Sequence, residues 1–465
     1  VERKMRKFFS RDERIDCIVV SKSLLCVLYF SFFILLSSCN ASKNAAGARM
    51  ESSFGVAAKF LLEAPELKGA HIGISIYDPA EKKYLFNYEG DKYFTPASNT
   101  KLITCYAAMK YLGDSLVGMR YKLDGDTLFL IPSGDPTLLH SDFNIQPVMD
   151  LLKSTRASNI SIAQNNWNDK PLGAGWAWDD YNEDYSAERS AMPVYGNLIH
   201  FEGTADQWSF FPSLKGKIAD AHFTDSTFNF VQRDIGANNF RVSFNSSSIK
   251  KFDVPFVTDS GRTAIGLLQQ ILPSKLSLND NAAASNDSRN YMAVHSQPTD
   301  SLLKIMMHRS DNFFAEQSLL MVSNELLNVM SDEKIIDTLL KTDYAAMPQR
   351  PQWADGSGLS RFNLFTPQDF VFVLDKMRNE FSWKRISNIL PTGGTGTLEG
   401  LYTKYPGRIF AKTGTLNNNI ALSGYLITDK NRTLIFSVLV GDHTTSSRAV
   451  RGRIEQCITS IMVNN

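Results

Sequence analysis

Hydrophobic and polar positions along this chain follow strand-like and helix-like spacings in turn. Near the N-terminus, residues 72–77 and 84–88 have the spacing of two strands, and an Asp-Pro turn joins them. Helical spacing follows, and it places four apolar residues on one face, Leu102, Cys105, Met109 and Leu112. The pattern therefore predicts two paired strands followed by a helix with a buried face.

The C-terminal part of the chain returns to this mixture. Helical periodicity covers residues 300–307 and 313–327. Three strand-like segments follow, at 408–415, 420–428 and 433–440, and an amphipathic helix with Val450, Ile454, Ile458 and Ile461 on one face closes the chain. Two N-terminal and three C-terminal strands with helices around them predict one α+β domain, built from residues 51–113 and 285–465.

The middle of the chain, residues 114–284, has a different character. Short strand-like segments at 127–131, 194–201 and 240–244 alternate with turns rich in Gly, Ser, Asn and Asp. One helix is expected at 146–154, and no segment repeats. We interpret this region as an insertion that forms one or two β-rich subdomains.

The first residues resemble an export signal. Basic residues precede an uncharged apolar run, 24–36, which is too short for a comfortable membrane span but suits a secretory signal. The run ends in Leu36-Ser37-Ser38-Cys39, which resembles a bacterial lipobox. We expect residues 1–38 to be a lipoprotein signal peptide, Cys39 to carry lipid and 39–50 to be a tether. The protein would then be exported and anchored by lipid in the bacterial cell envelope, facing the periplasm.

Two alternatives for this segment stay open, an ordinary signal peptide and a short anchor with an incidental cysteine. After cleavage the chain would keep three cysteines, Cys39, Cys105 and Cys457, which are too few for a disulfide framework. Cys105 and Cys457 both lie on apolar helix faces, so we expect them to be buried small hydrophobes.

Composition and charge exclude some functions. The 465 residues are 43% hydrophobic and 21% charged, as in an ordinary globular protein. The formal net charge is +1, so no broad basic surface indicates nucleic-acid binding. The seven histidines have no metal-ligand spacing, and we expect neither a metal nor a cofactor.

The candidate chemistry begins at Ser98-x-x-Lys101. Residues three apart on a helix are neighbours, so the lysine amine can take the proton of the serine hydroxyl once its pKa is lowered. This motif alone is weak, because about two chance matches are expected in a chain of this length. A second match, at Ser247 and Lys250, lies in a polar serine-rich run without a helix after it, and we regard it as chance.

Two further elements make the signal strong. Ser310-x-Asn312 lies in a loop before a helix, and Lys412-Thr413-Gly414 ends a strand. This trio, in this order, is similar to the active-site motifs of class A β-lactamases and penicillin-binding proteins. Four longer segments resemble the D-alanyl-D-alanine carboxypeptidase/endopeptidase family, the class C low-molecular-mass penicillin-binding proteins: 302–312, 355–361, 133–138 and 175–180.

The resemblance implies a serine β-lactamase/transpeptidase-like domain, an antiparallel sheet with helices on both sides, carrying a large inserted β-rich region. It implies that Ser98 attacks peptidoglycan stem peptides, that β-lactams inhibit the enzyme, and that Lys101 is the base. The other catalytic residues implied are Ser310, Asn312 and Lys412. The substrate-binding residues implied are Thr413, Gly414, Thr415 and, around the stem-peptide side chain, Asp180, Tyr185 and Arg361.

The sequence leaves three hypotheses for the activity. The first is a serine D-Ala-D-Ala carboxypeptidase, a DD-endopeptidase, or both. The second is a β-lactamase, although no glutamate here has an asparagine four positions on, as class A enzymes require for deacylation. The third is a lipoprotein with an inactive site that binds cell-wall peptide, although every expected side chain is present.

Overall fold

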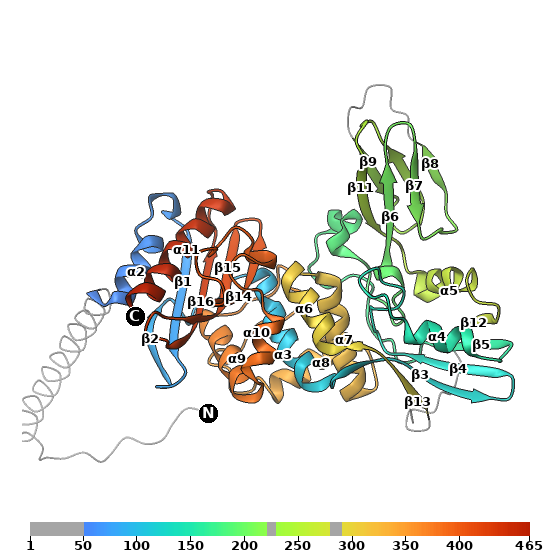
Figure 1. Ribbon diagram of the computed structural model, residues 1–465, viewed down its shortest axis with the longest axis horizontal. Helices are drawn as coiled ribbons and strands as arrows, with labels where there is room; N and C mark the ends of the chain where they lie inside the picture. The colour runs from blue at the N-terminus through green and yellow to red at the C-terminus, as the bar shows by residue number, and fades with distance from the viewer. Residues whose placement is uncertain (1–50, 221–228, 280–290) are drawn as a thin grey trace, which may run out of the picture. The chain divides into compact units, whose positions relative to one another are not determined.

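The computed structural model describes residues 51–220, 229–279 and 291–465 (Figure 1). The chain divides into two compact units, Val1–Val56 and Ala57–Asn465, and of the first only residues 51–56 are described. The expected signal peptide 1–38, the tether 39–50 and Cys39 therefore lie outside the described residues. No described helix has both the length and the apolar character to cross a membrane. The first described helix is α2 (Ser53–Leu62).

Both ends of the second unit build one antiparallel sheet (Figure 1). Its strand order is β14 (Ile409–Leu416), β15 (Asn419–Ile427), β16 (Thr433–Gly441), β1 (His71–Asp78) and β2 (Lys83–Tyr88). Strand β1 pairs with β16, with Ile74 opposite Val438. The predicted α+β domain with two N-terminal and three C-terminal strands is confirmed.

Helices cover both faces of this sheet. Strands β15 and β16 are buried at almost every position, which requires a cover on each face. Helix α11 (Ser447–Asn464) packs against β15, and α9 (Pro367–Glu380) packs against β1, β15 and β16. Figure 1 shows α11 on one side of the strands and α9 and α10 on the other.

Helix α9 also belongs to a cluster of helices that pack around α3. Helix α3 (Lys101–Tyr111) contacts α6 (Thr299–Arg309), α7 (Asn312–Leu327) and α9, and the cluster is completed by α8 (Asp332–Lys341) and α10 (Trp383–Ile389). Helix α3 buries nine of its residues from Lys101 to Met109, so it lies at the centre of the domain core. Cys105 on α3 and Cys457 on α11 are both buried and free, as expected.

The inserted region has a sheet of its own. Its order is β12 (Lys275–Asn279), β5 (Asn159–Ala163), β4 (Thr127–Pro132), β3 (Ser115–Asp124) and β13 (Met292–Pro298). Helix α4 (Pro147–Ser154) confirms the helix expected at 146–154. Strand β13 belongs to this sheet although it follows residue 284, where the sequence placed the end of the insertion. It pairs with β3, with Pro298 opposite Ser115.

Two smaller sheets complete the insertion. One is β11 (Lys250–Pro255), β6 (Leu198–Gly203) and β7 (Trp208–Phe211), and the other is β8 (Ile218–Asp220), β10 (Phe240–Ser243) and β9 (Phe230–Arg233). The strand expected at 194–201 begins only at Leu198, because Tyr195, Gly196 and Asn197 all have positive φ and form a turn. The sequence also missed α5 (Arg262–Gln269), a short helix that contains Gly266.

The insertion is tied to the catalytic-motif helix α7 by Gln317. This side chain is fully buried and donates to the carbonyl oxygens of Gly134, at 2.7 Å, and Ser190, at 2.9 Å. Its own carbonyl oxygen accepts from the Ser190 N–H at 3.2 Å. Since Asn312 begins the same helix, these bonds fix two segments of the insertion beside the SxN motif.

Candidate active site

Ser98 lies in a tight turn at the start of α3. Residues Ala97–Thr100 form a 3₁₀ turn, Asn99 N–H donates to the Pro96 carbonyl oxygen at 3.2 Å, and Ala97 has a φ of 49°. The α-helix itself begins at Lys101, three residues later than Ser98. In a 3₁₀ turn, residues i and i+3 lie on the same side, so the two side chains meet. Lys101 Nζ is 2.9 Å from Ser98 Oγ.

Lys101 has three hydrogen-bond acceptors around its amine. Besides Ser98 Oγ, Nζ contacts Asn312 Oδ1 at 2.6 Å and the Ser357 carbonyl oxygen at 2.8 Å. The side chain is 0% exposed. An ammonium group uses three donors, whereas a neutral amine has two donors and a lone pair. When two N–H groups bind Asn312 and Ser357, the lone pair of a neutral Lys101 faces the Ser98 hydroxyl.

Burial controls the charge of Lys101. Desolvation lowers the pKa of its amine to about 8, and the carboxylates of Asp355, Glu316 and Asp311 oppose this decrease. A substantial fraction of Lys101 is therefore neutral in mildly alkaline solution, which an exposed lysine would not be.

A second lysine lies in the same site. Lys412 on β14 is fully buried, and its Nζ donates to Ser310 Oγ at 2.8 Å and to the Thr413 carbonyl oxygen at 2.7 Å. Ser310 ends α6 with a left-handed φ of 61°, which turns its hydroxyl away from the helix. Burial, and then the charge of Lys101, hold the pKa of Lys412 well below its ordinary value.

Strand β14 presents a free edge to Ser98. It is the edge strand of the sheet, and the Ala411 N–H points outward to the Pro391 carbonyl oxygen at 3.1 Å. Backbone N–H groups alternate along a strand and β14 pairs with β15 without a bulge, so the N–H groups of Thr413 and Thr415 point to the same outer edge.

Gly414 allows this strand to lie against the turn that holds Ser98. A Cβ at this position would be 2.5 Å from the Pro96 carbonyl oxygen and 3.1 Å from Asn99 N. Gly358 is needed for a similar reason, since its φ is +84° and a Cβ would be 1.9 Å from the Ala97 carbonyl oxygen. The turn that holds Ser98 is therefore closely packed on two sides by glycine backbone.

A cavity of about 460 Å³ opens in front of Ser98. Its lining combines Ser310, Asn312 and Thr415 with the three residues proposed for the stem-peptide side chain, Asp180, Tyr185 and Arg361. Of the three residues that follow Lys412, only Thr415 is part of this lining; Thr413 and Gly414 support the strand. The structure thus brings together residues that are separated by more than 200 positions in the sequence.

Contacts inside the cavity wall connect the insertion to the SxN motif. The Tyr185 hydroxyl donates to Asp180 Oδ1 at 3.0 Å, and Asn312 Nδ2 donates to the Tyr185 carbonyl oxygen at 3.0 Å. Asp179 lines the same cavity and was not singled out from the sequence. Two neighbouring carboxylates and Arg361 therefore face one space.

Some residues at the site carried no signal in the sequence. Arg451 on α11 donates from Nη2 to Thr415 Oγ1 at 2.7 Å, which leaves the proton of that hydroxyl free to point into the cavity. No motif surrounds Arg451. Ser357 acts through its carbonyl oxygen, a group that every residue has, although the segment 355–361 was part of the family resemblance.

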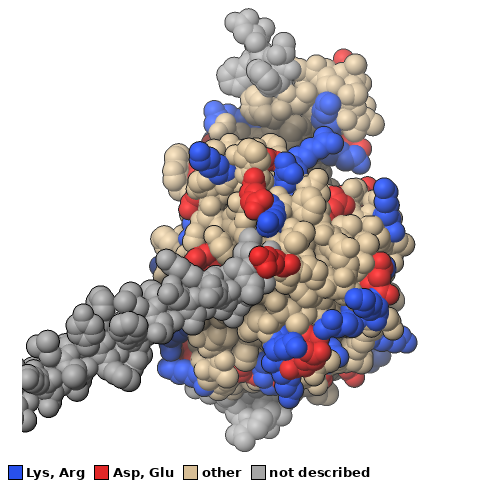
Figure 2. Space-filling view, turned by 90° about the vertical axis from the view of Figure 1, so that its left-hand side faces the viewer, with Lys and Arg blue, Asp and Glu red and all other residues tan. Residues whose placement is uncertain are grey.

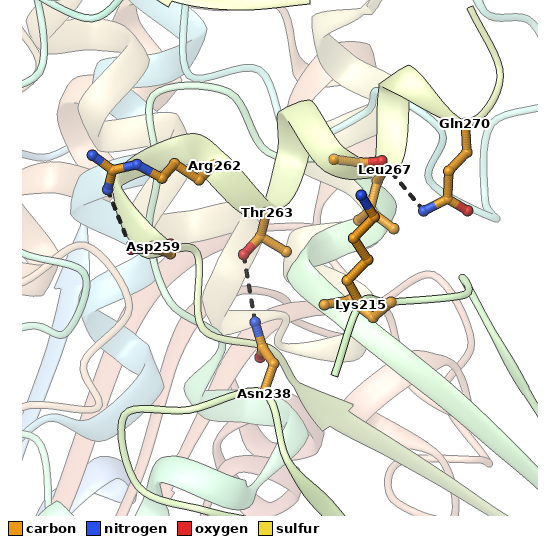
Figure 3. A pocket seen from close by; sticks show the side chains of 9 residues that line it. Lys215, Asn238, Asp259, Arg262, Thr263, Leu267 and Gln270 are labelled. Atoms are coloured by element: carbon orange, nitrogen blue, oxygen red, sulfur yellow. Dashed lines mark hydrogen bonds and ion pairs between the residues drawn. The ribbon is translucent and has the colours of Figure 1, made fainter. Parts of the chain in front are cut away.

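A smaller hollow of about 200 Å³ lies in the insertion (Figure 3). Its side chains largely bind one another: Asn238 Nδ2 to Thr263 Oγ1 at 3.4 Å, and Arg262 to Asp259 at 3.4 Å. No serine–lysine pair lines it. The described residues also contain no group of three or more His, Cys, Asp or Glu side chains arranged to hold a metal ion.

The face of the molecule in Figure 2 has no dominant charge. On the face in Figure 2, Lys and Arg lie interspersed with Asp and Glu and form no extended basic patch over the described atoms. This mixture of signs on one face agrees with the net charge of +1.

The fold and the motif geometry define the class of serine penicillin-binding enzymes. The chain belongs to the D-Ala-D-Ala carboxypeptidase 3 (S13) family, whose model matches residues 56–461. It is therefore a serine D-Ala-D-Ala carboxypeptidase of the cell wall, which acts outside the cytoplasm on peptidoglycan.

Individual relatives agree with this assignment. The chain is 26% identical to a D-alanyl-D-alanine carboxypeptidase of Actinomadura sp. (strain R39), an alignment that covers 88% of this chain and 85% of the relative. It is 22% identical to the D-alanyl-D-alanine carboxypeptidase DacB of Haemophilus influenzae, over 81% of this chain and 87% of that one. The crystal structure of penicillin binding protein 4 (dacB) from Haemophilus influenzae has the same fold, with a TM-score of 0.69 at 19% identity, covering 87% of this chain and 98% of that one.

Replacement of Gly414 tests the packing of β14 against the turn that holds Ser98. Gly414→Ala should slow acylation by fluorescent penicillin by about 100-fold, because the new methyl group forces the strand away from Pro96 and a shift of about 1 Å has that cost. Gly452→Ala is the matched control, since a Cβ there meets nothing within 4 Å. Equal acylation rates in the two variants would contradict the packing argument.

Proposed function

We propose that Ser98 is the residue that stem peptides and β-lactams acylate, and that Lys101 is its general base. The observation that carries this proposal is the 2.9 Å contact between Lys101 Nζ and Ser98 Oγ at a lysine that is 0% exposed. A buried amine with a lowered pKa is the kind of group that can take a hydroxyl proton near neutral pH.

The reaction follows from the contacts. Neutral Lys101 takes the proton of Ser98 Oγ while this oxygen attacks the carbonyl carbon of the penultimate D-alanine. The N–H groups of Ser98 and Thr415 stabilise the oxyanion, which is supported by the outward direction of the β14 N–H groups. The C–N bond then breaks, and Ser310 relays a proton to the departing amine. Water hydrolyses the ester and restores Ser98.

The substrate's terminal carboxylate has a binding site beside Lys412. Thr415 can donate its hydroxyl proton to this carboxylate, because Arg451 already donates to the Thr415 oxygen. An anion at this place favours the charged form of Lys412. Since the two lysines repel each other's charge, substrate binding would favour the neutral form of Lys101 and thus prepare the base.

We further propose that the enzyme cleaves two related bonds. A terminal D-alanyl-D-alanine bond and a D-alanyl cross-link between stem peptides both present a D-alanine carbonyl to the same nucleophile. Carboxypeptidase and endopeptidase activities would therefore share Ser98, Lys101 and the oxyanion site, and they would differ in the groups beyond the departing amine.

Mass spectrometry tests the nucleophile. Penicillin treatment should add one adduct to the peptide that contains Ser98, and Ser98→Ala should abolish both the adduct and the release of D-alanine from purified muropeptides. Ser247→Ala, the chance match in the sequence, should react normally. An adduct on another serine would refute the assignment. Rapid turnover of a chromogenic cephalosporin would indicate a β-lactamase, and absence of any label would indicate an inactive binding protein.

We propose that the acidic and basic side chains of the cavity recognise the side chain of the stem peptide by binding its charged groups. Diaminopimelate ends in an ammonium and a carboxylate, and Asp180 and Arg361 offer one partner for each. Loss of one such contact costs about 1.5–3 kcal/mol, or roughly a 10- to 100-fold decrease in kcat/KM. Asp180→Ala and Arg361→Ala should therefore impair cleavage of diaminopimelate peptides, while peptides without that side chain should be almost unaffected.

Arg241→Ala is the control for this pair, because Arg241 is exposed in the insertion and donates only to Gln232 within the described residues. Penicillin acylation monitors the catalytic residues in all three variants. Equal losses on both kinds of peptide would show that Asp180 and Arg361 support the fold or the chemistry, and the pocket would have to be abandoned.

Lipid anchoring in the cell envelope, facing the periplasm, is proposed from the segment Leu36-Ser37-Ser38-Cys39 after its uncharged run. Cys39→Ala should release soluble protein or leave an unprocessed precursor, as fractionation and intact mass would show. Ser38→Ala, which keeps the cysteine, should remain processed and bound to the membrane. Normal processing and membrane binding of Cys39→Ala would mean that another anchor acts.

A further inference from the structure

The Ser357 carbonyl oxygen is one of the two acceptors that aim the lone pair of Lys101 at Ser98, at 2.8 Å from Nζ. A backbone carbonyl can do this only if its peptide is held in place. Two buried carboxylates hold residue 357 from both sides. Asp355 Oδ1 accepts from the Gly358 N–H at 2.8 Å, and Glu316 Oε1 accepts from the Ser357 N–H at 2.7 Å.

Glu316 also contacts a residue outside the active site. Its other oxygen, Oε2, accepts from Arg189 Nη1 at 3.3 Å. Arg189 belongs to the insertion, is 1% exposed, and also binds Asp332 at 2.6 Å and Asp169 at 2.8 Å. The two oxygens of Glu316 therefore face two donors, one in the insertion and one next to the base.

We propose that Glu316 is a positioning residue for the catalytic base: it holds the N–H of Ser357, the residue whose carbonyl oxygen orients Lys101, and Arg189 of the insertion holds Glu316 in place. This inference rests on the proposed function of Ser98 and Lys101. It assigns to the insertion a role in setting the geometry and the basicity of Lys101, in addition to forming the wall of the substrate cavity.

The charges around Lys101 and Glu316 determine whether replacement of Glu316 raises or lowers the pKa of Lys101. Lys101 is faced by Glu316 from α7, by Asp311 directly before this helix, by Asp355 from the loop between α8 and α9, and by Lys412 from β14. Glu316 is faced by Asp355, Arg189 and Asp332. Burial, followed by Asp355, raises the pKa of Glu316 to about 7, and Arg189 opposes this rise. Glu316 is thus ionised in the alkaline range in which Lys101 loses its proton.

A purely structural role for this cluster makes a different prediction. Arg189 keeps two other carboxylates and the Lys170 carbonyl oxygen when Glu316 is altered. If Glu316 served only to neutralise Arg189, its loss would resemble the loss of Asp332, which binds the same guanidinium but has no contact with residue 357. Asp332 is therefore the matched control.

The test is the rate of acylation by fluorescent penicillin from about pH 6 to pH 10. In the wild type this rate should rise with pH as Lys101 becomes neutral, with a midpoint near its pKa of about 8. Glu316→Gln removes a negative charge that stabilises the protonated amine, so the midpoint should move to lower pH. The plateau rate should fall about 10- to 100-fold, because the single amide oxygen of glutamine cannot accept from both the Ser357 N–H and Arg189, so residue 357 is held less firmly.

Two variants separate charge from position. Glu316→Asp keeps the charge but is one methylene too short to reach the Ser357 N–H, so its midpoint should stay near that of the wild type while its plateau falls about tenfold. Asp332→Asn should keep both midpoint and plateau, with only a change in thermal stability. Circular dichroism and thermal unfolding confirm that each variant is folded.

The outcomes are distinct. An unchanged midpoint and plateau in Glu316→Gln, or the same profile in Glu316→Gln and Asp332→Asn, would overturn the inference. Failure of both Glu316 variants to fold would also overturn it, since the cluster would then be needed for the fold rather than for the base. If the wild type itself were not acylated, or showed no dependence on pH, the proposed function would fail and not the role of Glu316 alone.

Discussion

The site depends on the burial of two lysine side chains within one hydrogen-bonded group. Moving an ammonium ion out of water is costly, and two such ions near each other also repel, so the site favours a state in which the lysines do not both carry a charge. Lys101 and Lys412 are each 0% exposed, and burial is the largest cause of the lowered pKa of both. The same desolvation that destabilises the charged forms makes one amine available as a base.

Helix α7 is the element that keeps this costly arrangement in place. Three of its residues bind different parts of the chain: Asn312 binds Lys101, Glu316 binds Arg189 and the Ser357 N–H, and Gln317 binds Gly134 and Ser190. Every polar group named here is buried or partly buried and has a partner, which is the condition under which polar clusters stabilise a unique arrangement. The helix therefore joins the catalytic domain, the DGSG loop at 355–358 and the insertion.

Much of the fold could be predicted from the sequence because the central sheet has regular patterns. The strands at 72–77, 84–88, 420–428 and 433–440 have ends close to those in the structure. The turn at Tyr195–Asn197 was missed because positive φ at three successive residues, two of them not glycine, has no clear sequence signal. Strand β13 was placed outside the insertion because its partner, β3, lies far away in the sequence, and a pairing of this kind cannot be read from local spacing.

The candidate site also contains some residues that could be predicted from the sequence and others that could not. Ser98, Lys101, Ser310, Asn312 and Lys412 could be proposed because their chemistry depends on side chains at short, fixed spacings. The Ser357 carbonyl and the Arg189–Glu316 contact could not, since a backbone acceptor has no residue type and the ion pair joins positions 127 residues apart. Arg451 is a third case, because nothing in α11 distinguishes it from Arg448 or Arg453 until β14 is placed beside it.

The route of the chain explains how a large insertion can lie between the nucleophile and Ser310. The insertion leaves after α3 and returns directly before α6, and its ends are held together: Pro298 pairs with Ser115, and the Thr299 N–H donates to the Asp114 carbonyl oxygen at 3.0 Å. The 212 positions from Ser98 to Ser310 therefore begin and end at neighbouring points of the helical cluster. The entropy of closing such a loop increases only slowly with its length, so the region could become large without separating the two motifs. What this arrangement requires is a firm contact between the insertion and the helices that carry the motifs, and Gln317 and Arg189 make that contact at α7.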